Sequence, residues 1–416
     1  MKDWDAFYRD HVVESDYKVI LIILDGMPDI YVKELGGTPL SAAHKPNLDK
    51  LAKEGASGLL YPTIEPHIAV GSGVAHLALL GYELNKYPGR GPLEALGADL
   101  PVPEGAVVVR LNFATIENGI ITDRRAGRLS SGEAKTLFDR LKNLKSNKSW
   151  GLHYEIYHTM GYRGIMIITG KNASASITES DPEEAGRPPL KVLPTAKDKK
   201  AELTADFLNW FIEASRIELG HNNPTKANYI INRGAGVIKA YESFTTRYKF
   251  KAPVFISSFP LYKGVAKFLG IPVQEPEKTG SELTIKDKFL TAAKMIKDHD
   301  ITILHIKDPD IAGEDGDFLR KKEIIEEIDT SLPLITEAMG PDDTLLITSD
   351  HATPAIMREH SGHSIPIVMK GPFVRVDHVE KFSELDCITG SLGTFRAIQV
   401  MNLILMSTKR LKTFQP

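Results

Sequence analysis

The sequence predicts an α/β protein in which buried strands alternate with helices. Three short apolar runs, each typical of a buried strand, end directly in polar residues: Val19–Leu24, Ile301–Ile306 and Thr344–Thr348. Segments of helical period lie between such runs. Because ligands of α/β sheets bind outside the carboxyl ends of the strands, we expect a functional site where the three runs end.

The other elements follow from local patterns along the chain. Residues 47–55 (NLDKLAKEG) have a helical pattern that a glycine ends. Residues 127–192 contain helix, strand and the stretch SDPEEAGRPPLKVLP, which predicts a loop or a substrate-facing flap. A long helix is predicted over 200–220, and another begins near Phe318.

Composition excludes several classes of protein. The chain has 416 residues, of which 42% are hydrophobic and 25% charged, and its formal net charge is −3. These values argue against a disordered chain, a collagen-like repeat and a strongly basic nucleic-acid binder. No apolar run approaches the roughly 20 residues of a membrane helix, and the polar N-terminus lacks the apolar region of a signal peptide. With Cys387 as the single cysteine, we expect a cytoplasmic protein without nucleic-acid or membrane partners; a homo-oligomer stays open.

The strand-end loops contain a set of residues that bind hard cations. They are Asp25, Asp308, Asp310, Glu314, Asp350, His351, His360 and His363. Carboxylates and imidazoles without thiolates suit Mn²⁺, Mg²⁺, Zn²⁺ or Co²⁺. A surface loop is the alternative for SDHATPAIMREHSGHSIP, but it poorly explains three of the 13 histidines falling so close together.

The segment HIKDPDIAGEDGD contains a second pair of candidate ligands. Asp310 and Glu314 are four residues apart, which places both on one side of a turn or a helical start. Capping of the helix near Phe318 is the competing role for the acids of this segment, and we assign it to Asp315 and Asp317. Asp310 lies too early in the segment for that role.

Ser72 stands between two glycines, directly before an apolar helical run (AVGSGVAHLALLGY). At a helix N-terminus, backbone N–H groups and the helix dipole favour an anion such as phosphate. A helix cap and a metal-activated nucleophile both need this position, and the local sequence leaves the two roles open.

Several basic residues, some beside glycines, could bind an anionic substrate. They are Arg110, Arg124, Arg125, Arg128, Arg233 and Lys263. Arginine binds carboxylate and phosphate through two parallel hydrogen bonds. A solvated basic turn is the alternative for any one of them.

Ten motifs resemble, in order, those of the archaeal-type 2,3-bisphosphoglycerate-independent phosphoglycerate mutases, a branch of the alkaline phosphatase superfamily. They are LIILDG, TPLSAAHKPNLDKLAKEG, GSGVAHLALLGY, GRGPLEALG, NFAT, DRRAGR, LYKGVAKFLG, HIKDPDIAGEDGD, SDHATP and HSGHSIP. The resemblance spans roughly residues 18–405. It implies an alkaline-phosphatase-like sheet between helices, with a smaller α/β domain inserted into it. Together with the different sequence pattern in the middle of the chain, the resemblance predicts a core domain of residues 16–105 plus 250–416 and an inserted domain of residues 106–249.

The resemblance implies a phosphotransferase with two divalent metal ions and a phosphoserine intermediate, which interconverts 3-phosphoglycerate and 2-phosphoglycerate without added 2,3-bisphosphoglycerate. Ser72 occupies the place of the nucleophile. The places of the metal ligands fall on Asp25, Ser72, Asp350 and His351 for one ion, and on Asp310, Glu314 and His360 for the other. The candidate substrate-binding set is Arg110, Asp123, Arg124, Arg125, Arg128, Arg233 and Lys263.

Four positions depart from the family pattern. Gly73 replaces an acid after the nucleophile, Glu314 replaces a histidine ligand, His363 replaces an acid, and Glu183 replaces a histidine that faces substrate. A carboxylate at position 314 shifts the expected metal from Zn²⁺ or Co²⁺ towards Mn²⁺ or Mg²⁺. The departures keep two alternatives open: a related phosphoryl or phosphonyl transferase or phosphatase for another small acid, and a binding protein without activity.

Overall fold

The computed structural model describes residues 4–63 and 65–413. The chain folds into two compact units: residues up to 87 and from 241 onwards form the core unit, and residues 88–240 form the inserted unit. Both boundaries lie earlier in the chain than the sequence placed them. Helix α5 (Arg90–Gly97) packs against strands of the inserted unit, whereas helix α8 (Phe244–Tyr248) packs against the N-terminal helix α1 (Trp4–His11).

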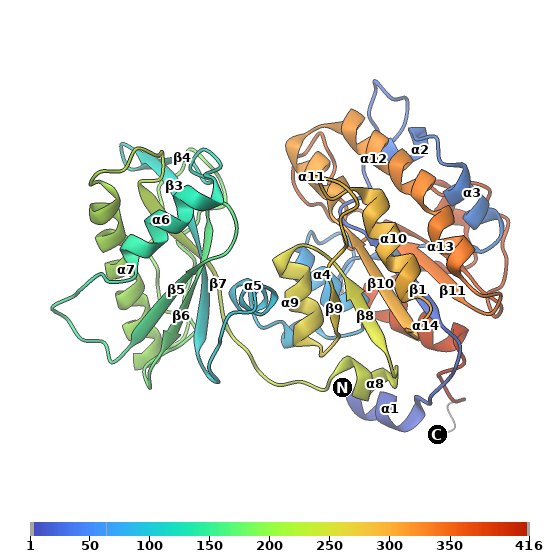
Figure 1. Cartoon of the computed structure of the whole chain (residues 1–416), viewed down its shortest axis with the longest axis horizontal. Helices are drawn as coiled ribbons and strands as arrows, with labels where there is room; N and C mark the ends of the chain where they lie inside the picture. The colour runs from blue at the N-terminus through green and yellow to red at the C-terminus, as the bar shows by residue number, and fades with distance from the viewer. Residues whose placement is uncertain (1–3, 64, 414–416) are drawn as a thin grey trace. The chain divides into compact units, whose positions relative to one another are not determined.

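The core unit is built on an eight-stranded sheet in the order β13-β2-β12-β11-β1-β10-β8-β9 (Figure 1). Its strands are β1 Val19–Leu24, β2 Ala56–Tyr61, β8 Pro253–Ile256, β9 Val273–Gln274, β10 Ile301–Ile306, β11 Thr344–Thr348, β12 Ile365–Lys370 and β13 Gly393–Arg396. The three predicted strands have the predicted bounds and lie side by side, with β1 parallel to both β10 and β11. Since parallel strands have their carboxyl ends at one edge, the polar residues after β1, β10 and β11 meet there.

Helices cover both faces of the core sheet. They include α2 Pro39–Ala42, α3 Pro46–Lys53, α4 Ser72–Leu79, α9 Pro260–Phe268, α10 Ile285–Met295, α11 Asp308–Asp315, α12 Phe318–Ser331, α13 Pro333–Ala338 and α14 Val400–Ser407. Apolar residues of α3, α10, α12 and α13 form one cluster with Ile22 of β1 and Leu304 of β10. Because side chains alternate along a strand, Ile303 and His305 point to the opposite face, where Tyr262 of α9 stacks on His305.

The inserted unit contains a second, antiparallel sheet. Its strands β4-β3-β6-β5 pair in this order, and β7 also pairs with β3. Their bounds are β3 Val107–Glu117, β4 Ile120–Asp123, β5 His153–His158, β6 Arg163–Thr169 and β7 Tyr229–Val237. Helices α6 (Ser131–Leu141) and α7 (Lys199–Leu219) bury their apolar residues against this sheet, and α7 confirms the helix predicted over 200–220.

Two local predictions have different outcomes. Asp317 caps α12, because its side chain accepts the N–H of Arg320. The same prediction for Asp315 is wrong, since that residue is the last of helix α11. The stretch around residues 181–191 lacks helix and strand, as predicted.

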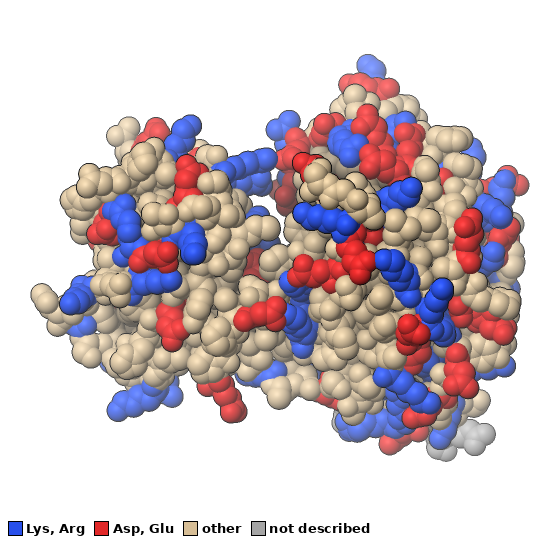
Figure 2. Space-filling model, viewed as in Figure 1, with Lys and Arg blue, Asp and Glu red and all other residues tan. Residues whose placement is uncertain are grey.

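Surface charge and helix length agree with the composition. On the face drawn in Figure 2, acidic and basic side chains are interspersed, in keeping with the formal net charge of −3. Within the described part of the chain, every helix is too short or too polar to cross a membrane.

Candidate metal-binding active site

The loops after β1 and β11 bring two carboxylates and an imidazole together. Asp25 follows β1, and Asp350 and His351 follow β11; all three side chains are fully buried. The Nε2 atom of His351 lies 3.5 Å from Asp25 Oδ1 and 3.2 Å from Asp350 Oδ2. Their ligand atoms lie within 4.8 Å of one another, a spacing that one metal ion could bridge.

The glycine of the Asp25–Gly26 pair is required by the crowding of this edge. Gly26 has a φ of +60°, and a Cβ atom there would lie 2.5 Å from Asp310 Oδ1 and 2.6 Å from the hydroxyl of Thr353. Any side chain would therefore strain the backbone and displace a candidate ligand. The N–H of Gly26 instead donates to Asp350 Oδ1 over 3.2 Å.

Ser72 adjoins this first group. It is the first residue of α4 and is not the cap, because Gly71 has the cap position and no side chain caps the helix. The Ser72 hydroxyl lies 3.0 Å from Nε2 of His351. The structure thus excludes the helix-cap role of the Ser72 side chain, since the hydroxyl lies at the candidate ligands and the helix end has no side-chain cap.

A second group comprises Asp310, His351 and His360, whose ligand atoms also lie within 4.8 Å of one another. Nε2 of His360 is 3.6 Å from Asp310 Oδ1 and 3.9 Å from Glu314 Oε1. The Glu314 carboxylate therefore borders the group, although 41% of its side chain is exposed.

Two other residues of the predicted set, Asp308 and His363, belong to neither group. Asp308 forms an ion pair with Lys288. His363 is exposed and shares a hydrogen bond with Ser361.

Hydrogen bonds assign the proton of His351. The Thr353 hydroxyl donates to Asp310 Oδ1 over 2.6 Å, so it can only accept from Nδ1 of His351, 3.1 Å away. Nδ1 therefore carries the proton, and Nε2 presents its lone pair to Asp25, Asp350 and Ser72. Burial lowers the pKa of His351 despite the nearby carboxylates, which keeps the imidazole in the neutral form that metals bind. This proton position favours His351 as a ligand of the first group.

One carboxylate oxygen of the site has no hydrogen-bond partner, as is expected of an atom that binds a metal ion. Asp350 Oδ2 is fully buried and accepts no hydrogen bond, although His76 and His351 each have a nitrogen 3.2 Å away. A buried carboxylate oxygen without a donor or a cation is costly. The donor set of carboxylates, imidazoles and a hydroxyl therefore fits hard divalent cations.

Lys307 is a residue of the site that the sequence reasoning missed. Its ammonium lies 3.2 Å from Asp25 Oδ1 and also pairs with Asp310, so that it links the two ligand groups. Burial opposes its charge, but Asp25 and Asp310 outweigh burial and raise the pKa of Lys307 well above its usual value. For Asp25 in turn, Lys307 and His305 outweigh burial and lower the pKa of the carboxyl group. The sequence did contain a signal for Lys307: it directly follows strand β10 and directly precedes Asp308, at the edge where the site was expected.

Two buried histidines were also missed because each lies within an apolar run. His76 of α4 donates through Nδ1 to the Ser72 carbonyl over 2.8 Å, and its Nε2 has no hydrogen-bond partner. His305 of β10 contacts Asp25 Oδ2 through Nε2 at 2.8 Å. Burial lowers the pKa of His305 to about 4, although the hydrogen bond to Asp25 opposes this effect.

The predicted substrate-binding residues divide between the two units. Lys263 lies on α9 of the core unit and pairs with Glu275. In the inserted unit, Arg110 is buried against Glu94 and Asn112, at 2.9 and 3.0 Å, and burial lowers its pKa to about 9. Arg110 is therefore already part of an internal ion pair.

The DRRAGR loop has a defined backbone. Asp123 accepts the N–H groups of Arg125 and Gly127, over 2.7 and 2.6 Å, so its role is to shape the turn. Arg124 forms two hydrogen bonds with the buried Asp181, while the side chains of Arg125 and Arg128 are exposed.

Asp181 also joins Arg233 to this loop. The guanidinium of Arg233 lies 3.4 Å from Asp181 and pairs with Glu183, one of the four departures. The structure thus places Arg124 and Arg233 on one shared carboxylate.

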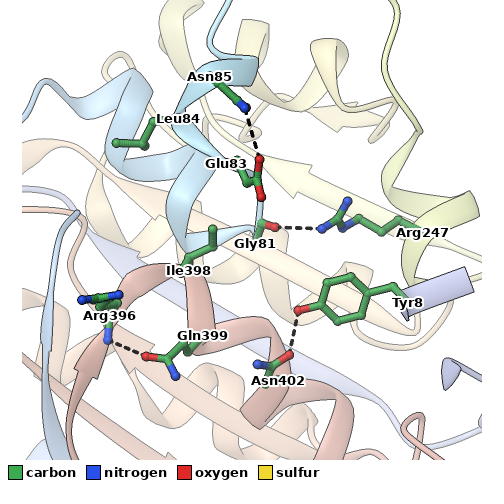
Figure 3. A pocket seen from close by; sticks show the side chains of 10 residues that line it. All are labelled: Tyr8, Gly81, Glu83, Leu84, Asn85, Arg247, Arg396, Ile398, Gln399 and Asn402. Carbon is green, nitrogen blue, oxygen red and sulfur yellow. Dashed lines mark hydrogen bonds between the residues drawn. The ribbon is translucent and has the colours of Figure 1, made fainter. Parts of the chain in front are cut away.

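A cavity of about 490 Å³ lies elsewhere in the core unit (Figure 3). Among its lining residues, Tyr8 donates to Asn402, and Arg247 donates to the carbonyl of Gly81. None of the predicted site residues lines this cavity. Its polar side chains bond largely with one another and with the backbone, so we do not place the chemistry there.

Comparison with known proteins points to one family. A model of the family "2,3-bisphosphoglycerate-independent phosphoglycerate mutase" matches residues 52–223. A protein of that name from Methanopyrus kandleri is 36% identical over 423 residues, covering 97% of this chain and 99% of its own. A protein named a probable member from Thermotoga maritima is 37% identical over 415 residues and covers 100% of both chains.

Solved structures agree with these matches. A protein of Pyrococcus horikoshii is 29% identical, with a TM-score of 0.80 over 97% of this chain and 100% of its own. The cofactor-independent phosphoglycerate mutase of Thermoplasma acidophilum is also 29% identical, with a TM-score of 0.63 over 94% and 99%.

Proposed function

The chain belongs to the family of 2,3-bisphosphoglycerate-independent phosphoglycerate mutases, and from that premise we propose that it interconverts 3-phosphoglycerate and 2-phosphoglycerate through a phosphoserine at Ser72. The observation that carries the proposal is the position of the Ser72 hydroxyl, 3.0 Å from His351 Nε2 and beside the first ligand group. A cytoplasmic location stays a prediction from the sequence, and the sequence leaves a homo-oligomer open.

The two ligand groups would hold two divalent cations. Asp25, Ser72, Asp350 and His351 would hold one; Asp310 and His360, with Glu314 at their border, would hold the other. Bound cations supply positive charge to a serine oxygen and to phosphoryl oxygens, which lowers the barrier to phosphoryl transfer. The carboxylate of Glu314 favours Mn²⁺ or Mg²⁺ over Zn²⁺ or Co²⁺ in the second place.

Ser72 performs the covalent step. Its Oγ forms a bond to the phosphorus of 3-phosphoglycerate while the bond from phosphorus to the 3-oxygen breaks. The proton lost by the Ser72 hydroxyl balances the one that the 3-oxygen gains, which leaves phosphoserine and glycerate. The 2-hydroxyl of the retained glycerate then attacks the same phosphorus, and Ser72 leaves. The phosphate thus moves between hydroxyls with no net gain or loss of water, provided that water is kept from the phosphoserine.

The basic residues hold the remaining charges of the substrate in this proposal. The exposed Arg125 and Arg128 are suited to bidentate binding of carboxylate or phosphate, and Lys263 adds a point charge. Asp123 fixes the backbone of the arginine loop through its two N–H contacts. Arg110 supports the inserted sheet, because its charge is already matched by Glu94.

One observation favours a second candidate function. Glu183, a departure from the family pattern, pairs with Arg233, and this contact takes up a proposed substrate-binding guanidinium. A related transferase or phosphatase for another small phosphorylated acid would accommodate that change.

An assay of the purified full chain separates the two functions. The chain is incubated with Mn²⁺ and 3-phosphoglycerate without 2,3-bisphosphoglycerate, and 2-phosphoglycerate and free phosphate are measured by ³¹P NMR. Formation of 2-phosphoglycerate without stoichiometric phosphate release is the expected result. Release of phosphate from other small acids without any 2-phosphoglycerate would favour the second function.

A further inference from the structure

A chain of hydrogen bonds crosses three neighbouring strands directly behind the first ligand group. It starts at Ser257 after β8, passes through His305 of β10 and ends at Asp25 after β1. The Ser257 hydroxyl lies 3.3 Å from Nδ1 of His305, and Nε2 of His305 lies 2.8 Å from Asp25 Oδ2. All three side chains are buried.

The direction of these hydrogen bonds follows from Asp25. Its carboxylate only accepts, so Nε2 of His305 carries the ring proton and donates to Oδ2. Nδ1 of the neutral ring then accepts from the Ser257 hydroxyl, whose oxygen accepts the N–H of Phe259 over 3.3 Å. Asp25 Oδ2 is thereby held on the strand side, while Oδ1 faces His351 Nε2 at 3.5 Å.

The position of His305 is unusual for a polar residue. It lies in the run ITILHI, in which every residue is buried. An imidazole buried among apolar side chains destabilises the fold unless its nitrogens are hydrogen-bonded. Both nitrogens are satisfied here, and Tyr262 stacks on the ring with the centroids 3.7 Å apart. The ring is therefore fixed in its place and in its plane.

A third cation held by Asp25, His76 and His305 is the competing interpretation, because their ligand atoms also lie within 4.8 Å. The contacts oppose it. Both ring nitrogens of His305 are already engaged, because Nε2 donates to Asp25 and Nδ1 accepts from Ser257, so this imidazole has no lone pair left for a cation.

We propose that His305, oriented by Ser257 and Tyr262, is a positioning residue that holds the Asp25 carboxylate in the orientation needed to bind a divalent cation beside Ser72. The inference rests on the proposed function only in taking Asp25 as a metal ligand. Groups that hydrogen-bond to metal ligands commonly change metal affinity when they are removed.

The test measures Mn²⁺ binding to the metal-free full chain by isothermal titration calorimetry, without substrate. His305→Leu removes both hydrogen bonds, and we expect it to weaken one of the two Mn²⁺ sites by about 10- to 100-fold. His305→Gln keeps an N–H donor at a similar reach, so affinity should be largely restored. Thr302→Val is the matched control on the same strand, because the buried Thr302 hydroxyl has no hydrogen-bond partner; its affinity should equal that of the wild type.

Several outcomes would overturn the proposal. Wild-type affinity in His305→Leu would remove the role of His305, and equal loss in the Leu and Gln variants would show that ring packing matters and not the N–H donor. Three Mn²⁺ ions in the wild type and two in His305→Leu would establish the competing cation site. Should His305→Leu fail to fold, Ser257→Ala leaves the imidazole in place, and unchanged Mn²⁺ affinity there would count against the chain of hydrogen bonds. If the wild type lacks mutase activity but His305→Gln restores the Mn²⁺ affinity that His305→Leu loses, the proposed function is refuted and the role of His305 stands.

Discussion

The hydroxyl of Ser72 lies 3.0 Å from Nε2 of His351, although the two residues are 279 positions apart in the chain. Thr353 binds the other ring nitrogen, so the lone pair of Nε2 is directed towards Ser72, Asp25 and Asp350. The serine at the start of α4 and the candidate ligands after β11 thus lie in one place.

Replacement of Ser72 tests the nucleophile. Ser72→Ala should lower kcat by at least about 10³-fold, because no other group can carry the phosphate, and no phosphoenzyme should be trapped after acid quenching with ³²P-labelled substrate. Ser215→Ala is the control: its hydroxyl is also buried, has no hydrogen-bond partner and lies on α7 of the inserted unit. Full activity of Ser72→Ala would rule out the phosphoserine.

Metal content tests Glu314. Glu314→Ala should lower the affinity for one Mn²⁺ ion by about tenfold, since a carboxylate beside His360 is lost, whereas Glu314→His should retain the ion and shift the preference towards Zn²⁺. Equilibrium dialysis with elemental analysis measures both, and Glu323→Ala removes an exposed carboxylate of α12 as a control. Two tightly held Mn²⁺ ions in Glu314→Ala would take this residue off the ligand list.

Two arginines of the inserted unit should respond in opposite ways. Arg128→Met should raise KM for 3-phosphoglycerate about ten- to a hundredfold, because a charged hydrogen bond to the substrate is lost, and should change stability little, because the side chain is exposed. Arg110→Met removes one of the two arginines that pair with the buried Glu94, Arg90 being the other at 2.9 Å, and should cost about 1–3 kcal/mol of stability. Steady-state kinetics and urea unfolding measure the two effects. A higher KM in Arg110→Met at wild-type stability would contradict the assignment.

A buried ion pair supports the loop that holds the site. Lys321 of α12 lies 2.8 Å from Asp29, and both are fully buried; its ammonium also donates to the Thr353 carbonyl over 2.8 Å. Lys321→Met should lower the free energy of unfolding by about 3–5 kcal/mol, because Asp29 is left buried and charged. The neighbouring Lys322 forms a part-exposed pair with Glu326, so Lys322→Met should cost less than about 1 kcal/mol. Urea unfolding of both variants checks the difference, and equal losses would refute it.

The thiol of Cys387 should make the protein less stable at high pH. Burial raises its pKa to about 12 in the folded chain, against roughly 8.5 when unfolded. Between these values the folded state binds the additional proton, so stability falls as pH rises. Urea unfolding at pH 8 and pH 10 should show a smaller loss for Cys387→Ala than for the wild type. A thiol reagent at pH 8 should label Cys387 only after unfolding; rapid labelling of the native protein would show that the thiol is accessible.

The sequence predicted best those elements that are formed mainly by burial of apolar side chains. Val19–Leu24, Ile301–Ile306 and Thr344–Thr348 were predicted with the bounds that the structure has, because an apolar run that ends in polar residues leaves little choice of strand ends. Capping was harder: Asp317 caps α12, whereas Asp315 ends α11, and both acids have the same local preference. The boundaries of the two units also differ from the predicted ones. Helix α5 packs against strands of the inserted unit, and the sequence of the helix does not show which strands it will contact.

The sequence by itself determined the fold class, the strands that form the site edge, the family and the candidate ligands, because periodicity and ordered motifs are local properties of a chain. Only the tertiary structure decided what each polar residue contacts. It turned Ser72 towards His351, placed Lys307 between two carboxylates, matched Arg110 with Glu94, and set His305 between Ser257 and Asp25. These contacts join residues that are far apart in the chain. A hydrogen bond depends on distance and direction in space, which the pattern of a single segment does not contain.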